Sequence, residues 1–375
     1  MARIAIVGAG PAGASAGYHL STRGHAITLI DRAKFPRDKT CGDWITLGAV
    51  RELARMGIDR AELGRLAVER AEISTTVLAS PDATRTMCAG REPAYCIPRR
   101  VFDAILWQRA VGAGCRPMQR TVSGLATGDD RFLREFDCVV DARGAHAGRA
   151  NGVGLRAYWT VGRNRLEPHD ASSVQIFTDP VFPRGYGWIF PVHVEAESVR
   201  FNVGVGLWKA DSTPGHNVAD FFARFVGGNH VARRLRDGAA GPSGIGRPVG
   251  YHVALGSWRN RVADGVILRI GDAANLADPL TGDGIGNALK SGRLVAGAFD
   301  RGADAAAAGK RWQQLHDHAF AGELRWALIL RRALAGTRAK NLTSRLLDRA
   351  PALRRRVHAA FFGDTSYRAM VGLGD

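Results

Sequence analysis

The chain has 375 residues, of which 46% are hydrophobic, enough to bury the core of a globular protein of two closely joined domains. Its formal net charge of +17 favours acidic partners such as an anionic membrane surface or an acidic carrier protein. No apolar run approaches the roughly 20 residues of a membrane span, and the five scattered cysteines exclude a disulfide framework, so we expect a cytoplasmic protein that can also lie peripheral to a membrane.

The first predicted elements are a strand, a glycine-rich turn and a helix. The apolar run Ile4–Val7 reads as a buried parallel strand. In the turn that follows, Gly8 allows a tight bend, Gly10 lets backbone N–H groups approach a pyrophosphate, and Gly13 lets the helix lie against the strand. The phosphates would then face the positive end of the helix dipole.

A second predicted strand, His25–Ile30, ends in Asp31. This acid stands at the spacing expected for a carboxylate that hydrogen-bonds a ribose hydroxyl. Strand, turn, helix and acid together predict a Rossmann-like dinucleotide site, although their spacing does not distinguish FAD from NAD.

The middle of the chain alternates apolar with small or polar residues. Such a period of two predicts half-buried strands. The clearest alternation has apolar residues at Val199, Phe201, Val203, Val205 and Leu207. A second strand is predicted to begin at Val174.

A second glycine-rich segment follows the apolar strand Val266–Ile270. It contains Gly271 and Asp272, a loop with Pro279, and a helix start at Gly282–Ile285. This segment resembles the second FAD motif of the flavoproteins that include aromatic hydroxylases and geranylgeranyl reductases. The resemblance implies that the acid holds a ribityl or ribose hydroxyl and that the helix N–H groups face the flavin, where the dipole would stabilise its reduced, anionic form.

Three further motifs are similar to those of the geranylgeranyl reductase family, and the resemblance covers most of residues 1 to 300. It implies that Cys41 and Arg99 lie near FAD and that an antiparallel sheet covers the flavin. The motifs are Cys41-Gly42-Asp43, then Arg99, Phe102, Asp103 and Leu106, and finally Tyr186, Trp188, Phe190 and Pro191 with Gly204 and Gly206.

Three residues and one spacing depart from the family pattern. Trp44 replaces a small residue, and Asp283 replaces a glutamate. The distance from Pro191 to Gly204 is longer than usual, and Arg143 stands where hydroxylases carry the aspartate of an Asp-Gly motif. A large indole beside the flavin should reshape any substrate cavity, and the Arg143 position leaves direct use of NAD(P)H open.

The C-terminal part reads as helix, with Trp312, Leu315 and Trp326 at helical spacing. The stretch Arg345–His358 mixes leucines with arginines. It is typical either of a membrane-surface helix or of a packed helix with a solvated basic face. We prefer the second interpretation.

We therefore expect an α/β protein with a Rossmann-like FAD-binding domain, an antiparallel β substrate domain and a helical C-terminal region. The expected limits are 1–70, 97–150 and 255–300 for the FAD-binding domain, 71–96 and 151–254 for the substrate domain, and 301–375 for the helices.

The candidate catalytic residues are Cys41, Trp44, Tyr186 and Trp188, and no metal site is expected. The proposed cofactor-binding residues combine the glycine motifs with the acids and basic groups beside them. They are Gly8, Gly10, Ala12, Gly13, Asp31, Arg32, Cys41, Arg99, Gly271, Asp272, Pro279, Gly282, Gly284 and Ile285.

The function implied by the resemblance is FAD-dependent reduction of carbon–carbon double bonds in a hydrophobic, isoprenoid-like substrate. The alternative is an FAD-dependent monooxygenase that hydroxylates a hydrophobic or aromatic natural product, and a third hypothesis is a noncatalytic flavin-binding scaffold. Electrons would come from NAD(P)H or from a separate reductase or ferredoxin. Without RNA-binding or zinc-knuckle motifs, we expect no nucleic-acid partner.

Overall fold

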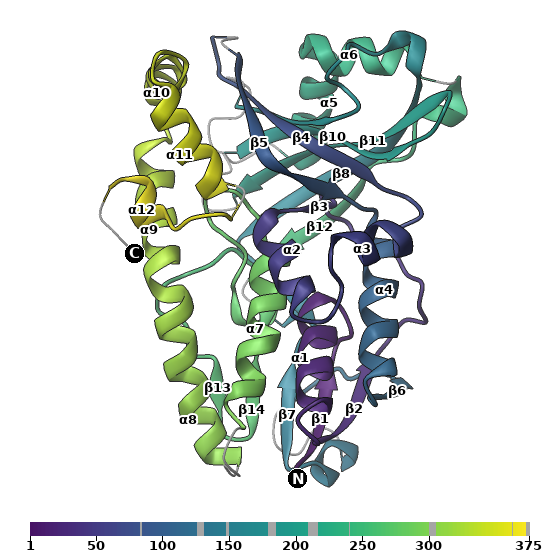
Figure 1. The fold of residues 1–375 in the computed structure, drawn as a ribbon, viewed down its shortest axis with the longest axis vertical. Coiled ribbons are helices and arrows are strands. Elements are labelled where there is room, and N and C mark those ends of the chain that lie inside the picture. The colour runs from purple at the N-terminus through teal and green to yellow at the C-terminus, as the bar shows by residue number, and fades with distance from the viewer. Residues whose placement is uncertain are drawn as a thin grey trace.

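Two sheets and a row of C-terminal helices make up the molecule (Figure 1). The computed structural model describes residues 1–82, 85–125, 131–147, 150–178, 185–208, 217–239, 241–299, 305–361 and 363–372. The smaller sheet lies near the N-terminus, the larger sheet lies at the opposite end, and the helices run along one side of both.

The smaller sheet has the strand order β13-β14-β7-β1-β2-β6. Its central strand β1 pairs in parallel with β2 and β7, and Ile4 and Ile6 of β1 are fully buried, as the apolar run predicted. The strands are β1 (Arg3–Val7), β2 (Ala26–Asp31), β6 (Arg116–Gln119), β7 (Cys138–Asp141), β13 (Ala263–Asp264) and β14 (Ile267–Arg269).

The larger sheet has the order β12-β8-β11-β10-β9-β4-β5-β3 and is antiparallel except for the β4–β9 pair. Its strands are β3 (Trp44–Ile45), β4 (Ala71–Ala79), β5 (Arg85–Cys96), β8 (Gly152–Gly162), β9 (Ser173–Phe177), β10 (Gly185–Val194), β11 (Ser198–Trp208) and β12 (Val249–Val253).

The alternating strand β11 differs from its prediction because its middle is buried on both faces. Phe201 and Phe225, the latter from the helix α5, share one core, while Asn202 on the opposite face is also fully buried. A covered second face turns an apparently half-exposed strand into an interior one.

The helices cover both sheets and extend to the C-terminus. A π-helical turn, Asp317–Ala321, joins α8 to α9, and the buried side chains of Trp312 and Phe320 hold this rod against the smaller sheet's core. The helices are α1 (Pro11–Ser21), α2 (Leu47–Ala54), α3 (Arg60–Leu66), α4 (Arg99–Gly112), α5 (Val218–Gly228), α6 (His230–Asp237), α7 (Ile285–Gly297), α8 (Ala305–His316), α9 (Gly322–Ala333), α10 (Thr337–Arg349), α11 (Pro351–Phe361) and α12 (Tyr367–Met370).

The parallel sheet, the largely antiparallel sheet and the C-terminal helices confirm the predicted α/β fold class. The domain limits stay a prediction. In the described parts of the chain, none of the helices combines the length and apolar character needed to cross a bilayer.

Candidate cofactor and substrate site

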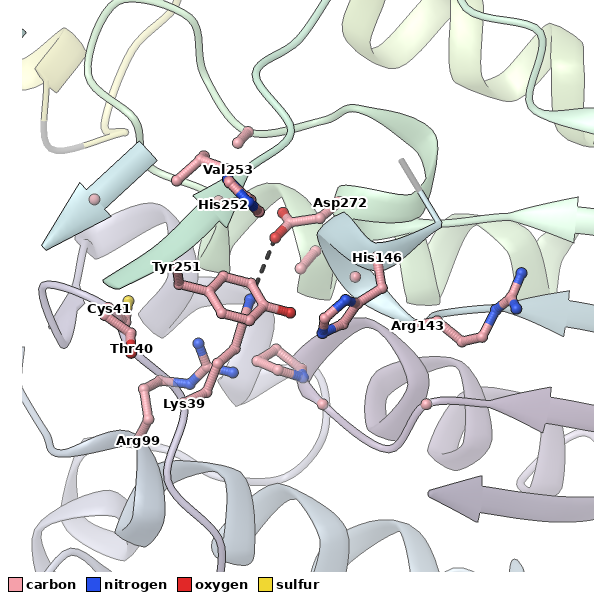
Figure 2. Close-up of a pocket in the computed structure, with 18 of the residues that line it drawn as sticks. Lys39, Thr40, Cys41, Arg99, Arg143, His146, Tyr251, His252, Val253 and Asp272 are labelled. Carbon is pink, nitrogen blue, oxygen red and sulfur yellow. Dashed lines mark hydrogen bonds and ion pairs between the residues drawn. The ribbon is translucent and has the colours of Figure 1, made fainter. Parts of the chain in front are cut away.

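A cavity of about 750 Å³ lies between the carboxyl ends of the parallel strands and the larger sheet. Figure 2 shows part of its lining, including Lys39, Tyr251 and Asp272. Gly13, Gly271 and Pro279 are outside its lining. The predicted cofactor residues that line it are Gly8, Gly10, Ala12, Asp31, Arg32, Cys41, Arg99, Asp272, Gly282, Gly284 and Ile285. The fold therefore brings the two glycine-rich segments, some 260 residues apart in the chain, to one cavity.

At two positions only glycine fits, because another part of the backbone lies too close for a side chain. Gly8 has a φ of +105°, and a Cβ on it would lie 2.2 Å from the carbonyl oxygen of Ala142. A Cβ on Gly13 would lie 1.8 Å from the carbonyl oxygen of Gly8. Any side chain at either position would push helix α1 away from the strand ends, so Gly13 acts without lining the cavity.

Gly10 instead faces open space beside two guanidinium groups. It is the N-cap of α1 and has no side-chain cap, so the first N–H groups of the helix point toward the cavity unpaired by a capping side chain. A Cβ on Gly10 would come within 3.5 Å of Arg37 Nη2 and 4.0 Å of Arg99 Nη2. Helix N–H groups and two guanidinium groups that surround Gly10 fit a pyrophosphate.

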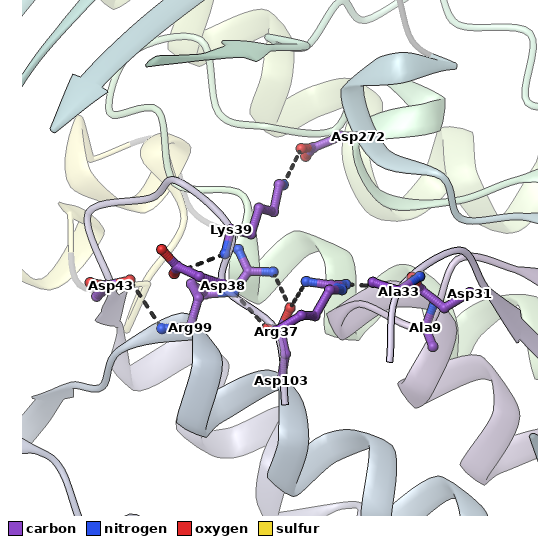
Figure 3. Close-up of polar contacts among 10 residues, drawn as sticks. All are labelled: Ala9, Asp31, Ala33, Arg37, Asp38, Lys39, Asp43, Arg99, Asp103 and Asp272. Atoms are coloured by element: carbon purple, nitrogen blue, oxygen red, sulfur yellow. Dashed lines mark hydrogen bonds and ion pairs between the residues drawn. The ribbon is translucent and has the colours of Figure 1, made fainter. Parts of the chain in front are cut away.

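A single buried acid holds those two arginines in place. Asp103 accepts hydrogen bonds from Arg99 Nε at 2.6 Å and from Arg37 Nη1 at 2.9 Å (Figure 3). Asp103 lies one helical turn after Arg99 in α4, which explains the spacing of the Arg-x-x-Phe-Asp element. Arg37 itself was missed by the sequence analysis because it lies in a loop without a recognisable pattern.

Asp31, the predicted ribose ligand, lies at the cavity end of β2. Its two carboxylate oxygens accept the backbone N–H groups of Ala9 and Ala33, each at 2.9 Å. Arg37 Nη2 lies 3.5 Å from the same side chain. These contacts fix the carboxylate in one orientation, as recognition of a ribose hydroxyl requires.

On the opposite side of the cavity, Asp272 forms an ion pair with Lys39 across 3.3 Å. The ammonium of Lys39 also lies 5.2 Å from the ring of Tyr251. Beside Asp272, helix α7 begins after Gly284, which provides no side-chain cap. The Asp283 carboxylate accepts the Ile285 N–H at the start of α7 instead, so binding of the flavin by this helix start stays a prediction.

A buried polar network supports the Cys41-Gly42-Asp43 segment. Asp43 is fully buried with a φ of +65°, and its Oδ2 accepts hydrogen bonds from Tyr158 Oη at 2.6 Å and Asn202 Nδ2 at 2.8 Å. Asn202 also donates to the Cys41 carbonyl oxygen and accepts from Trp188 Nε1. Burial raises the pKa of the Asp43 carboxyl to about 6, although these hydrogen bonds oppose the rise.

The Tyr-x-Trp and Gly-x-Gly motifs face each other across two strands. Trp188 of β10 pairs with Gly204 of β11, and Tyr186 pairs with Gly206. A Cβ on Gly204 would lie 2.2 Å from the indole of Trp188, so glycine leaves the space that the ring occupies. After Pro191 the pairing shifts by one residue at a bulge between Pro191 and His193, so the long stretch from Pro191 to Gly204 contains this bulge and the turn that joins the two strands.

A second cavity, of about 540 Å³, adjoins the first. The two share Cys41, Tyr186 and Phe190 in their linings. Trp44 lines only the second cavity, where its ring centroid lies 5.7 Å from that of Phe190. At the other end the lining comes from α9, from α10 and from the turn between them. It includes Arg331, Arg332, Leu334, Ala335, Lys340, Thr343 and Ser344.

Burial favours the protonated forms of the titratable groups between the cavities. Burial raises the pKa values of the Cys41 thiol and the Tyr186 phenol. Burial and the neighbouring Asp278 raise the pKa of the Asp283 carboxyl to about 6. The described residues contain no cluster of histidines, cysteines and acids that could hold a metal ion.

Comparisons with known proteins agree with this geometry. Residues 3–88 match the family model of FAD-dependent oxidoreductases. The chain is 28% identical over 322 residues to the digeranylgeranylglycerophospholipid reductase of Methanosphaerula palustris, covering 78% of this chain and 75% of that protein. It is 29% identical over 327 residues to the menaquinone reductase of Mycobacterium tuberculosis, with coverages of 80% and 76%.

Solved structures share the fold. A geranylgeranyl bacteriochlorophyll reductase-like protein from Thermoplasma acidophilum superposes with a TM-score of 0.72 at 19% identity, covering 92% of this chain and 90% of that one. Flavin-dependent halogenases match the same fold at 14–20% identity.

Residues 3–88 are thus similar to FAD-dependent oxidoreductases, and the fold of the chain is shared with solved flavoprotein structures. Its relatives include geranylgeranyl-type reductases, which confirms the resemblance that the sequence motifs indicated.

Proposed function

We propose that the protein reduces carbon–carbon double bonds in the isoprenoid chain of a lipid-like substrate. The observation that carries this proposal is the second cavity, whose aromatic and aliphatic lining adjoins the cofactor cavity at Cys41 and Tyr186. An apolar chain in that cavity would reach the boundary between the two spaces. The names of the relatives support the same class of substrate.

The residues around the first cavity fit FAD: an uncapped helix start with two arginines for the pyrophosphate, and a fixed carboxylate, Asp31, for a ribose. We propose that Arg37 and Arg99 hold the phosphates and that Asp272 and the start of α7 hold the flavin end. When bound there, FAD supplies the hydride for reduction of a double bond. NAD(P)H or a separate reductase or ferredoxin would supply its electrons.

Two of the candidate catalytic residues, Tyr186 and Trp188, use their polar hydrogens in hydrogen bonds within the protein. Tyr186 Oη donates to the carbonyl oxygen of Thr281, and Trp188 Nε1 donates to Asn202 at 2.8 Å. We therefore assign both rings to shaping the cavity and excluding water. These hydrogen bonds hold both rings in fixed orientations in the lining of the first cavity.

Asp283 is the carboxyl group best placed to deliver a proton to the substrate. It lines the second cavity, and its oxygens accept from Thr46 Oγ1 at 3.2 Å and from the Ile285 N–H at 3.1 Å. With a pKa of about 6, it holds a proton over part of the neutral range, as a general acid must.

We place the protein in the cytoplasm, at the surface of an anionic membrane rather than on an acidic carrier protein. Its five cysteines are free thiols, as in a reducing compartment. A lipid-like substrate is dissolved in a membrane, and a basic protein is attracted to an anionic one.

The test is an anaerobic half-reaction. The FAD-loaded protein is reduced with dithionite without oxygen and mixed in separate experiments with a prenyl phospholipid, a prenylated quinone and a prenyl diphosphate. We expect one of these to reoxidise the flavin and to gain two hydrogen atoms by mass spectrometry. Reoxidation by oxygen only, with a product that gains an oxygen atom, would replace the proposal with the monooxygenase alternative. FAD binding without turnover under any donor would favour a scaffold.

A further inference from the structure

The second cavity reaches the protein surface at α10. Lys340, Thr343 and Ser344 of this helix line the cavity, and the exposed residues Arg332 and Ala335 lie at the same end. In Figure 1, α10 and α11 lie at the outer end of the C-terminal helices, beside the larger sheet. The entrance to the cavity and these two helices therefore occupy one side of the molecule.

The opposite side of α10 exposes leucines. Leu342 and Leu346 are 60% and 48% exposed, and Leu353 at the start of α11 is 39% exposed. Leu342 and Leu346 are four residues apart and share a helix face, whereas Ser344 and Leu347 are buried and attach the helix to the protein. One face of α10 therefore forms part of the cavity wall, and another face exposes an apolar stripe to solvent.

Basic residues surround this stripe. Residues 331–358 contain nine lysines and arginines and one acidic residue. Arg338 and Arg349 lie one turn before Leu342 and one turn after Leu346, and Arg356 follows Leu353 by one turn. Among the described residues, none of these three arginines has an ion-pair partner, whereas Arg345 pairs with Asp82. We call the surface of Leu342, Leu346, Leu353, Arg338, Arg349 and Arg356 the basic leucine face.

We propose that the basic leucine face docks onto an anionic membrane and that a lipid substrate passes directly from the bilayer into the second cavity. The exposed leucines favour this membrane-surface interpretation over the packed helix that we preferred from the sequence. The charge of the face is complementary to anionic head groups, and its leucines suit the boundary between head groups and acyl chains. An acidic carrier protein would match the arginines but gives no reason for leucines in solvent beside the cavity entrance. The inference rests on the proposed function, because it names the partner from which that substrate arrives.

The test is vesicle sedimentation with the full-length, FAD-loaded protein. Vesicles of phosphatidylglycerol mixed with phosphatidylcholine are compared with vesicles of phosphatidylcholine. We expect binding to the anionic vesicles that weakens as salt is raised. Exchange of both Leu342→Ser and Leu346→Ser should lower the partition coefficient on the order of tenfold or more, since apolar area is no longer buried. Arg349→Gln with Arg356→Gln should lower it by a similar factor on anionic vesicles.

Two matched controls separate docking from general surface effects. Val68→Ser changes a valine that is 74% exposed just after α3, and Arg116→Gln with Arg131→Gln removes two exposed charges from the region of the smaller sheet. We expect both controls to bind vesicles nearly as the unchanged protein does. Equal losses in the controls would overturn the assignment to this face.

Turnover of detergent-solubilised substrate distinguishes this inference from the proposed function. If the protein reduces that substrate but does not bind anionic vesicles, the docking proposal fails and the reductase proposal stands. Binding only to an acidic protein, or a leucine variant that binds vesicles as well as the unchanged protein, would also overturn docking. If vesicles bind and no prenyl lipid is reduced, the proposed function fails instead.

Discussion

The two cavities of this protein differ in which chemical groups form their walls. The first is lined largely by backbone groups and charged side chains. They include glycines at the strand ends, the uncapped start of α1 and the Arg37–Asp103–Arg99 cluster. The second is made of side chains, with aromatic rings from the larger sheet on one side and helices α9 and α10 on the other. A backbone site recognises groups common to every FAD, whereas a side-chain site sets which substrate enters.

Changes in one cavity should therefore leave the other largely intact. The largest expected effect comes from Gly10→Val, because the added side chain occupies the proposed pyrophosphate cradle and meets no backbone atom nearby. We expect the affinity for FAD to fall by about a thousandfold or more, or ~4 kcal/mol, in a titration of the apo-protein. Gly112→Ala, where a Cβ meets nothing within 4 Å, is the control. Unchanged affinity in Gly10→Val would place the pyrophosphate elsewhere.

Asp283→Asn tests the boundary between the cavities. Loss of a general acid costs on the order of a hundredfold or more in rate, so single-turnover reduction of the substrate should slow by that factor while FAD binds normally. In the unchanged protein the rate should fall as pH rises through about 6, because Asp283 then loses its proton. The variant should lack this fall. A variant with the original rate and pH profile would assign the proton to another group or to water.

Asp278→Asn sharpens the same prediction. Asp278 lies outside both cavity linings, but its charge is the second cause of the raised pKa of Asp283. Neutralising it should move the midpoint of the pH profile to lower pH and leave the maximal rate nearly unchanged. A loss of rate at every pH would instead indicate damage to the site.

Asp43→Asn tests the hydrogen-bond network that supports the Cys41-Gly42-Asp43 segment. The folded-state pKa of Asp43 is about 6 against an ordinary value of 3.8, so its contribution to stability is complete below pH 3.8 and is lost as pH rises through about 6. The stability of the unchanged protein relative to the variant should fall by on the order of 2–3 kcal/mol between pH 4 and pH 7. Urea unfolding of both proteins at each pH measures it, and a constant difference would contradict the raised pKa.

Asp31→Ala should weaken FAD binding by ~1–2 kcal/mol, because a ribose hydrogen bond is lost. The Ala9 and Ala33 N–H groups also lose their acceptor, so thermal unfolding of the apo-protein must be measured beside the FAD titration. A loss of affinity larger than the loss of apo stability supports a ribose contact. Equal losses would assign Asp31 to the fold only.

The smallest effect on the cofactor is expected for Trp44→Ala, which enlarges only the second cavity. FAD affinity should change less than about threefold, whereas competition between prenyl substrates should shift severalfold toward bulkier chains. A large loss of FAD would show that the indole also supports the cofactor cavity.

Much of the cofactor cavity was predictable because its parts are contiguous in the chain. The cavity includes one continuous strand, turn and helix, formed by Ile4–Val7, Gly8, Gly10 and Gly13, so local spacing along the chain determines their relative geometry. Asp31 follows at the end of the neighbouring strand for the same reason. The Trp188 and Gly204 motifs were visible in sequence, but only the antiparallel register explained why they occur together.

The fold class, the nucleotide motif and the resemblance to geranylgeranyl-type reductases could be read from the amino-acid sequence, since they depend on local spacing. The tertiary structure was needed to reveal the Asp43–Tyr158–Asn202 network, the pairing of Arg37 with Asp103, and the second cavity. Their residues come from separate segments, and no periodic pattern links them. It also decided that Leu342 and Leu346 lie in solvent beside the cavity entrance, because burial depends on which helix face meets the rest of the protein.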